Sequence, residues 1–408
     1  MLPSLKIIEG GLQRVTEALA RDLATPRPHR VTPDWSPLEW QLAMAAAAAH
    51  GVAALLSRTS SWQHAGWQAF LAEQREHVVQ RHTLIVELLE RIDRDARAAL
   101  LPVVPLKGSA LHALQIYLPG ERPMADVDLL VRECDAAAAT TVLQGLGYVE
   151  SAPSWKHRIF KPVGGRAVPG LGEHRDNQIT IELHTRIQER LPVSAVDITA
   201  RIFAEAAQPG LNPYPSIGAL MSHLLLHAAG NICFRDARLL RLHDISLLAA
   251  RMSGADWNAL WSRHASDAPW WALPPLRLTA RYYRDAIPDS VLRRFEADCP
   301  MLLRRVSRDQ TLTQVSSSDL WIQLLPGIAW SRSVREAARY IRYRVSPSQE
   351  AVRERAAQVP TQLWAQGQSW AGLSRGRQIL VRLTRPVPRP DTLYVIRAAL
   401  ARHAADHS

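Results

Sequence analysis

The chain has 408 residues, of which 47% are hydrophobic and 21% are charged, as in a folded soluble protein with a large core. No run reaches the ~20 apolar residues of a membrane helix, and the N-terminus lacks the apolar stretch of a secretory signal. The three cysteines are widely spaced and form no Cys-x-x-Cys pair. This spacing argues against a disulfide framework or a zinc ribbon and favours a reducing compartment. We therefore expect a cytoplasmic protein without a transmembrane segment.

The net charge of +11 lies entirely in the C-terminal part of the chain. Residues 251–408 contain 24 arginines, no lysine and 13 acidic residues, whereas positive and negative charges balance over residues 1–250. Such asymmetry is typical of a region that binds an acidic partner, such as nucleic acid, an anionic membrane or an acidic peptide. The arginines are scattered rather than gathered in a polybasic arm, which favours solvated helix faces over a dedicated partner.

Helix-spaced apolar residues dominate the N-terminal quarter. Residues 1–33 indicate a short helix and a proline-containing linker, and residues 37–57 and 64–99 indicate further helices. In the last of these, four apolar positions from Val78 to Ile92 recur at intervals of seven, four and three, which places them on one face. The pattern predicts an N-terminal helical region over residues 1–99.

A mixed segment follows over residues 100–215. Period-two alternation and turn residues predict strands at 103–106, 126–131, 148–150, 158–161 and 178–184, and helices at 109–117 and 135–146. The stretch 162–176 is rich in glycine and proline and is predicted to be a loop that reaches toward the site. From residue 216 the pattern is helical almost to the end, which predicts a C-terminal helical, basic region over residues 216–408.

The most informative motif is a pair of aspartates at alternate positions of a predicted strand. Asp126 and Asp128 would project from the same face, with Cα atoms about 6–7 Å apart. Two like charges at that distance repel, and a divalent cation is the usual reason to keep both ionised. Taken alone, Asp-x-Asp also fits two solvated carboxylates at a strand end. The apolar flanks and the upstream Lys-Gly-Ser favour a metal site.

Upstream of the aspartates, Lys107, Gly108 and Ser109 join a predicted strand to a predicted helix. Free backbone N–H groups and a hydroxyl at a helix start suit a phosphate, and the same residues also fit a tight turn with a serine N-cap. Lys107 and Arg122 are candidate phosphate ligands, and each equally fits a pair with a nearby carboxylate, Asp126 in the case of Arg122. A phosphate cradle beside paired aspartates indicates metal-assisted phosphoryl or nucleotidyl transfer.

These residues resemble the nucleotidyltransferase superfamily related to DNA polymerase β, whose signature is Gly-Ser or Gly-Gly, a short helix, and Asp-x-Asp or Asp-x-Glu between apolar residues. The string Arg-Pro-Met-Ala-Asp-Val-Asp-Leu-Leu-Val (122–131) is similar to that of a bacterial branch described as uncharacterised nucleotidyltransferase. Sixteen residues separate Ser109 from Asp126, more than in the superfamily at large. A Gly-Glu-Arg-Pro insertion accounts for the extra length, and the bacterial branch shares it. The resemblance is specific at residues 105–131 and 179–184.

The resemblance implies an α+β fold, in which a small mixed-sheet polymerase β-like core lies between the N-terminal helical layer and a large C-terminal helical region. It also implies a third carboxylate on a neighbouring strand. Glu182, in the alternating string Ile-Thr-Ile-Glu-Leu-His, is the candidate, as general base or metal ligand. Glu182 fits nearly as well as a structural strand carboxylate that faces solvent or an arginine. Asp176, in the preceding loop, is a weaker candidate for the third carboxylate.

The activity implied by the resemblance is Mg²⁺-dependent transfer of an NMP group from an NTP such as ATP, with Mn²⁺ as a substitute metal. The implied site residues are Asp126, Asp128 and Glu182 for the metal and catalysis, and Lys107, Gly108, Ser109 and Arg122 for the nucleotide. A peptide, protein or small molecule is favoured as the acceptor. RNA is the alternative acceptor, because the C-terminal region is basic. A phosphotransferase with the same metal site and a non-catalytic NTP-binding regulatory protein are the alternatives.

A pair of histidines further along raises the question of zinc. His223 and His227 lie four residues apart on one face of a predicted helix, a spacing that permits zinc binding. No glutamate lies between them and no third ligand is evident. The pattern therefore favours hydrogen-bonded core histidines, with Asp244 as an acceptor for one of them.

Overall fold

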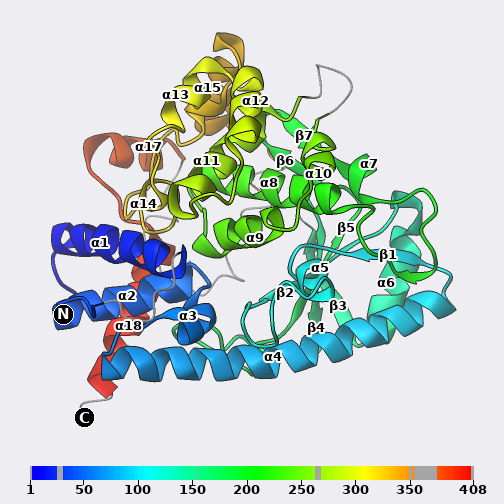
Figure 1. Ribbon diagram of the computed structural model, residues 1–408, viewed down its shortest axis with the longest axis horizontal. Helices are drawn as coiled ribbons and strands as arrows, with labels where there is room; N and C mark the ends of the chain where they lie inside the picture. The colour runs from blue at the N-terminus through cyan, green and yellow to red at the C-terminus, as the bar shows by residue number, and fades with distance from the viewer. Residues whose placement is uncertain are drawn as a thin grey trace.

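A helix of 34 residues, α4 (Ala65–Ala98), runs along one side of the molecule beneath a six-stranded sheet (Figure 1). The computed structural model describes residues 2–24, 31–153, 155–261, 268–347 and 375–405, and the single positions 349 and 352. The N-terminal half of α4 buries Trp67 and Phe70 against the other N-terminal helices, and its C-terminal half buries Ile85 and Ile92 under the sheet. One helix thus takes part in two hydrophobic cores.

The N-terminal helices agree with the sequence pattern except at one position. The predicted helix over 37–57 is broken at Gly51, whose φ of +69° is a left-handed conformation that ends helices and favours glycine. The helices that precede α4 are α1 (Leu5–Ala24), α2 (Pro37–Ala49) and α3 (Ala53–Thr59).

The sheet has the order β3-β4-β5-β2-β1-β8, with β2 parallel to β5, β1 parallel to β8, and the other neighbours antiparallel. Its strands are β1 (Pro102–Pro105), β2 (Asp126–Leu130), β3 (Tyr148–Pro153), β4 (Arg158–Pro162), β5 (Thr180–His184) and β8 (Gly210–Leu211). A separate hairpin consists of β6 (Gln188–Arg190) and β7 (Ala195–Asp197). The intervening helices are α5 (Gly108–Ala113), η1 (Glu133–Asp135), α6 (Ala136–Gly145) and α7 (Thr199–Ile202).

Alternation along β2 and β5 gives the sheet one apolar and one polar face at its centre. Val127, Leu129 and Ile181 pack with α4 and α6 in the smaller core. Because successive side chains point to opposite faces, the residues between them project toward the C-terminal helices. The polar groups of the site therefore lie between the sheet and those helices.

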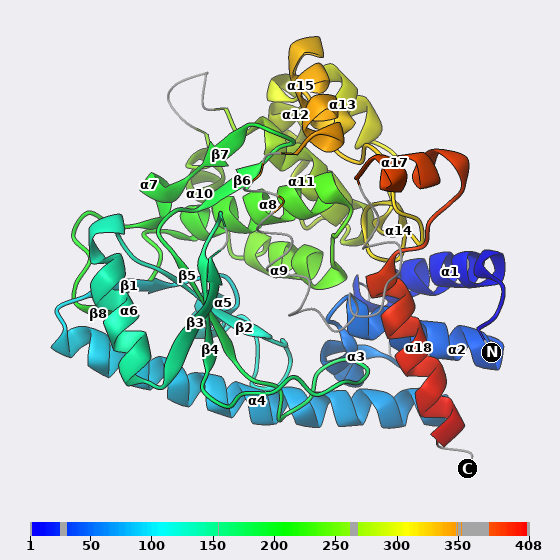
Figure 2. The ribbon, with the colours of Figure 1, turned by 180° about the vertical axis from the view of Figure 1, so that it is seen from behind.

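The C-terminal region is helical, as predicted, within the described residues. Its elements are α8 (Ile217–Phe234), α9 (Leu239–Ala249), α10 (Gly254–Asn258), η3 (Trp270–Ala272), α11 (Leu273–Tyr282), α12 (Asp289–Asp298), α13 (Met301–Val306), α14 (Leu312–Val315), η4 (Ile328–Trp330), α15 (Val334–Val345), α17 (Arg375–Thr384) and α18 (Pro390–Ala405). The last helix, α18, packs against α2, so both ends of the chain lie on the same side of the molecule (Figure 2). The predicted α+β class with a mixed-sheet core is confirmed.

Two observations qualify the expected organisation. The larger core draws Leu12, Leu106 and Leu224 from all three predicted regions, so the limits at residues 99 and 215 stay a prediction.

By length and composition α8 could cross a membrane, as could α2 and α3 if the bent pair is one span. However, 78% of the apolar window in α8 is buried inside the protein, which makes this weak evidence of a span.

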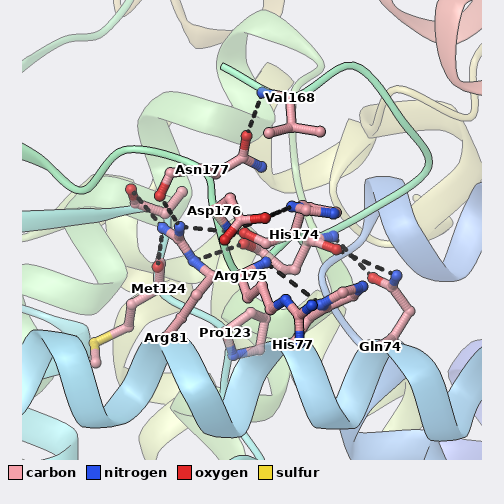
Figure 3. A network of polar contacts seen from close by, with 12 residues as sticks. Gln74, His77, Arg81, Pro123, Met124, Val168, His174, Arg175, Asp176 and Asn177 are labelled. Atoms are coloured by element: carbon pink, nitrogen blue, oxygen red, sulfur yellow. Dashed lines mark hydrogen bonds and ion pairs between the residues drawn. The ribbon is translucent and has the colours of Figure 1, made fainter. Parts of the chain in front are cut away.

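The loop between β4 and β5 folds back onto α4, where Gln74 holds it (Figure 3). The Gln74 side chain donates to the carbonyls of Leu171 and Glu173 at 3.2 and 3.3 Å and accepts from the Glu173 N–H at 2.8 Å. Gly172 lies between them with a φ of +82°, and a Cβ atom there would lie 2.2 Å from the Gln74 oxygen. The close approach of loop and helix therefore requires glycine at this position.

Arg81 joins the same loop to the start of β2 (Figure 3). Its guanidinium donates to the carbonyl of Asn177 at 2.5 Å and to those of Met124 and Ala125 at 3.2 and 3.3 Å. Only 2% of Arg81 is exposed. Since Met124 and Ala125 directly precede β2, this side chain fixes where that strand begins.

Replacement of Arg81 is expected to loosen this junction. In Arg81→Met the three carbonyls lose a buried donor, so the free energy of unfolding should fall by about 2–3 kcal/mol. Amide hydrogen exchange over residues 163–178 should quicken. Denaturant titration and exchange measured by mass spectrometry check both effects.

The matched control is Arg91→Met, an exposed arginine on the same helix. Its stability should change by no more than about 0.5 kcal/mol. Equal losses in the two variants would contradict the assigned role of Arg81.

Candidate active site

The register of β2 against β5 brings the three predicted carboxylates to one face of the sheet. Asp126 lies opposite Thr180, and Asp128 lies opposite Glu182. Paired residues of adjacent strands project to the same side, as do residues i and i+2 of one strand. Glu182 is half-buried, with its carboxylate near His157 and His184 rather than an arginine.

The turn between β1 and α5 places Lys107 against Asp128. The N–H of Leu106 donates to the Asp128 carbonyl at 2.9 Å, which aligns the two segments. Lys107 then takes a φ of +48°, a strained value for a residue with a side chain, of the kind that concentrates at functional sites. Its Nζ lies 2.8 Å from Asp128 Oδ1, and its N–H donates to the Tyr214 hydroxyl at 3.3 Å.

The two aspartates have opposite pKa shifts. Burial raises the pKa of Asp128, but the Lys107 ammonium and the hydrogen bond from His184 outweigh burial and hold that pKa well below its ordinary value. Burial and the neighbouring Asp128 charge raise the pKa of Asp126, against the cations of Lys107, Arg241 and Arg238. Asp128 is therefore the firmly ionised member of the pair.

Gly108 and Ser109 form the first turn of α5. The helix begins at Gly108 with Lys107 as its N-cap, so Ser109 lies inside the helix instead of capping it. A Cβ atom on Gly108 would lie 2.4 Å from Arg122 Nη1 and 2.9 Å from Met124 Sδ. Packing alone therefore demands glycine here, whatever else its N–H group binds. The helix ends at Ala113, four residues before the predicted end.

Arg122 is engaged with Asp244 of α9, not with Asp126. Its Nε and Nη2 donate to the two oxygens of Asp244, each at 2.8 Å, and the Tyr117 hydroxyl donates to the same carboxylate at 2.7 Å. Both charged side chains are buried, and the Arg122 cation keeps the pKa of Asp244 low in spite of burial. The structure thus shows pairing with a carboxylate, and nucleotide binding by Arg122 stays a prediction that this pair does not favour.

The other candidates have different surroundings. Asp176, the rival of Glu182, is exposed, and its carboxylate lies 3.6 Å from His174. His223 is buried and forms a 2.7 Å hydrogen bond with the Tyr214 hydroxyl. His227 Nδ1 lies 3.4 Å from a Glu189 oxygen. Neither histidine bonds to Asp244, so that expectation was wrong.

Residues that sequence reasoning missed complete the site. His184 Nε2 lies 3.1 Å from Asp128 Oδ1, and the alternation of β5 had already placed it on the same face as Glu182. Burial lowers the pKa of His184, but hydrogen bonds to Asp128 and Glu182 raise it overall. Arg238 and Arg241 reach the site from α9, far along the chain. No local spacing in the sequence connects these arginines with Asp126.

A pocket adjoins these groups between the sheet and α8. Its lining includes Lys107, His157, Glu182, His184, His223 and His227. The predicted carboxylate, the predicted lysine and several histidines thus share one cavity. Asp126 and Asp128 are not among its lining residues.

Comparison with known proteins agrees with the geometry. A family model described as uncharacterised nucleotidyltransferase matches residues 36–282, more than half of the chain. The matched range includes the strand pair, the β1–α5 turn and α9. No curated protein and no solved structure matches the chain.

The buried Arg122–Asp244 pair should be critical for folding. Arg122→Met leaves the Asp244 charge buried without its partner, so the free energy of unfolding should fall by about 3–5 kcal/mol. Arg14→Met removes an exposed pair with Glu39 and should cost at most about 1 kcal/mol. Chemical denaturation followed by circular dichroism measures both, and a small loss in Arg122→Met would contradict the assignment.

Proposed function

Because the chain belongs to the uncharacterised nucleotidyltransferase family, we propose that it transfers the NMP group of an NTP to an acceptor hydroxyl or phosphate. The observation that supports this most is the β2–β5 register, which sets Asp128 beside Glu182 on the face that also carries Asp126. Three carboxylates on one face form an oxygen-only donor set, which suits Mg²⁺, or Mn²⁺ in its place.

In this proposal Asp126, Asp128 and Glu182, which share one face of the sheet, would hold a divalent ion. Such an ion, when bound, neutralises the triphosphate and lowers the pKa of the attacking hydroxyl. The chain already compensates the charge of Asp128 with Lys107 at 2.8 Å. Lys107 is thus in place both to keep Asp128 ionised and to meet a phosphate oxygen at the same edge of the pocket.

The proposed step is an in-line displacement at the α-phosphorus. The acceptor oxygen forms a bond to that phosphorus, the bond to the oxygen between the α- and β-phosphates breaks, and pyrophosphate leaves. Glu182 accepts the acceptor's proton, since it is half-buried and faces the pocket. Gly108 would offer its N–H group and Ser109 its hydroxyl to the phosphates, because the Ser109 N–H already donates to the Leu106 carbonyl at 3.2 Å.

Arg241 is a further phosphate ligand in this proposal. Its Nε is buried with no hydrogen-bond partner in the described part of the chain. Burial and the Arg122 cation lower its pKa, and the carboxylates of Asp244 and Asp126 oppose this only in part. The positive charge of Arg241 acts on Asp126 and on Lys107. A triphosphate in the site would provide the missing negative charge.

The family description names neither the acceptor nor the phosphorus atom that is attacked, so both are part of the proposal. A peptide, protein or small molecule is favoured, and the basic C-terminal region keeps RNA as the alternative. Attack at the γ-phosphorus would use the same metal and phosphate contacts and would make the protein a phosphotransferase.

Transfer of label from NTPs separates these activities. Purified protein with Mg²⁺ is incubated with NTPs labelled at the α- or the γ-phosphate, with lysate fractions and the protein itself as acceptors. We expect transfer from the α-position, at least about 100-fold slower in Asp126→Asn and Asp128→Asn because each loses a metal-binding charge.

Asp176→Asn is the matched control, since it neutralises an exposed carboxylate on the loop. It should retain wild-type transfer. Label from the γ-position alone would convert the assignment to a phosphotransferase. Tight NTP binding with no transfer from either position would favour a regulatory NTP-binding protein.

The role of Arg241 has its own measurement. Arg241→Met should weaken binding of a non-hydrolysable NTP by about tenfold or more, as loss of a charge-assisted phosphate contact does. Calorimetric titration gives the affinity, with Arg281→Met, an exposed arginine on α11, as the control. Unchanged affinity in Arg241→Met would remove it from the nucleotide site.

A further inference from the structure

Two histidines and Glu182 converge at the end of the β4–β5 ladder. One ligand atom from each of His157, Glu182 and His184 lies within 4.8 Å of those of the other two. The glutamate oxygen is 3.4 Å from His157 Nδ1 and 3.7 Å from His184 Nε2. The imidazole rings meet edge to face, with centroids 4.9 Å apart.

Strand register explains why these side chains share one face. Ile159 pairs with Glu182 across antiparallel strands, and Arg158 pairs with Leu183. Continued by one position, this ladder sets His157 opposite His184, and residues two apart on a strand project to the same side. Glu182 and His184 therefore lie on β5, and His157 directly precedes β4.

One atom of this group lacks the partner that burial demands. His157 Nδ1 is buried with no hydrogen-bond partner among the residues that the structure describes. A buried polar atom left unpaired costs about 1–3 kcal/mol, so such atoms in native proteins generally have a function or a ligand. The neighbouring His223 differs, because its Nδ1 forms a 2.7 Å hydrogen bond with the Tyr214 hydroxyl.

We propose that His157, Glu182 and His184 bind a divalent transition-metal ion, with Zn²⁺ as the best fit. Two imidazoles and one carboxylate are a known ligand set of zinc sites that keep an open fourth position. Four ligands about 2.0–2.1 Å from a tetrahedral ion lie ~3.3 Å apart, and the Glu182 oxygen lies 3.4 and 3.7 Å from the two imidazole nitrogens. Imidazole nitrogen selects such ions over Mg²⁺, which prefers oxygen ligands.

The surroundings suit a site that exchanges its fourth ligand. All three residues line the pocket beside α8, so the open position faces a cavity. His184 Nε2 donates to Asp128 Oδ1 at 3.1 Å in the metal-free chain, and Lys107 holds the same oxygen, so metal binding at Nε2 would release that proton. The site shares Glu182 with the proposed nucleotidyl transfer but requires neither nucleotide nor acceptor, so either proposal can fail without the other.

Metal binding by the full chain tests the inference directly. Protein stripped with a chelator is titrated with Zn²⁺, Mn²⁺ and Mg²⁺ separately by calorimetry, and bound metal is counted after dialysis. We expect one Zn²⁺ per chain, with Mg²⁺ unable to displace it at equal concentration. His157→Ala and His184→Ala should each weaken Zn²⁺ binding by at least about 100-fold, since loss of a group that only orients a ligand already costs about 10–100-fold.

Three controls make the result specific. His227→Gln removes another imidazole from the same pocket, and Asp126→Asn removes a carboxylate of the proposed magnesium site; both should keep Zn²⁺ affinity within twofold. Circular dichroism checks that each variant is folded. If His184→Ala does not fold, His157→Ala, at the edge of the ladder, still tests the site. Absence of tight Zn²⁺ binding, or its retention in folded His157→Ala, would overturn the site whatever the transfer assay shows.

Discussion

Repulsion between closely spaced carboxylates is the constraint around which this site is organised. The register of β2 and β5 sets Asp128 beside Glu182, with Asp126 on the same face. Their charges are tolerated because the chain surrounds them with cations and proton donors: Lys107 and His184 at Asp128, and the arginines of α9 near Asp126. Without such compensation, buried carboxylates would take up protons and lose the ability to hold a cation.

The compensating groups come from distant segments, which makes the helical regions part of the site. Lys107 follows β1, and Arg241 lies on α9. The buried pair between Arg122 and Asp244 locks the segment before β2 to that same helix. On the opposite side, Arg81 of α4 holds the backbone that enters β2. The aspartate strand is therefore fixed from both helical layers, and loss of either contact would move the carboxylates relative to one another.

Patterns with short-range causes could be predicted from the sequence. Period-two alternation located β2 and β5, because one face of each strand is apolar and buried. The same alternation placed Glu182 and His184 on one face. The break between α2 and α3 was missed although its signal is local, because Gly51 stands just past the C-cap His50 and takes the left-handed conformation that commonly ends helices. Arg122 likewise offered several carboxylate partners in the sequence, and its true partner lies 122 positions away.

The sequence by itself determined the class of fold and the family, and it predicted the carboxylates of the candidate site, since these depend on residue type and local spacing. Tertiary structure alone decided which cation faces which carboxylate. It paired Lys107 with Asp128, gave Arg122 to Asp244, and brought His157 across the sheet to Glu182 and His184. The physical reason is that ion pairs and metal ligands are set by strand register and helix packing, which join residues that no local pattern connects.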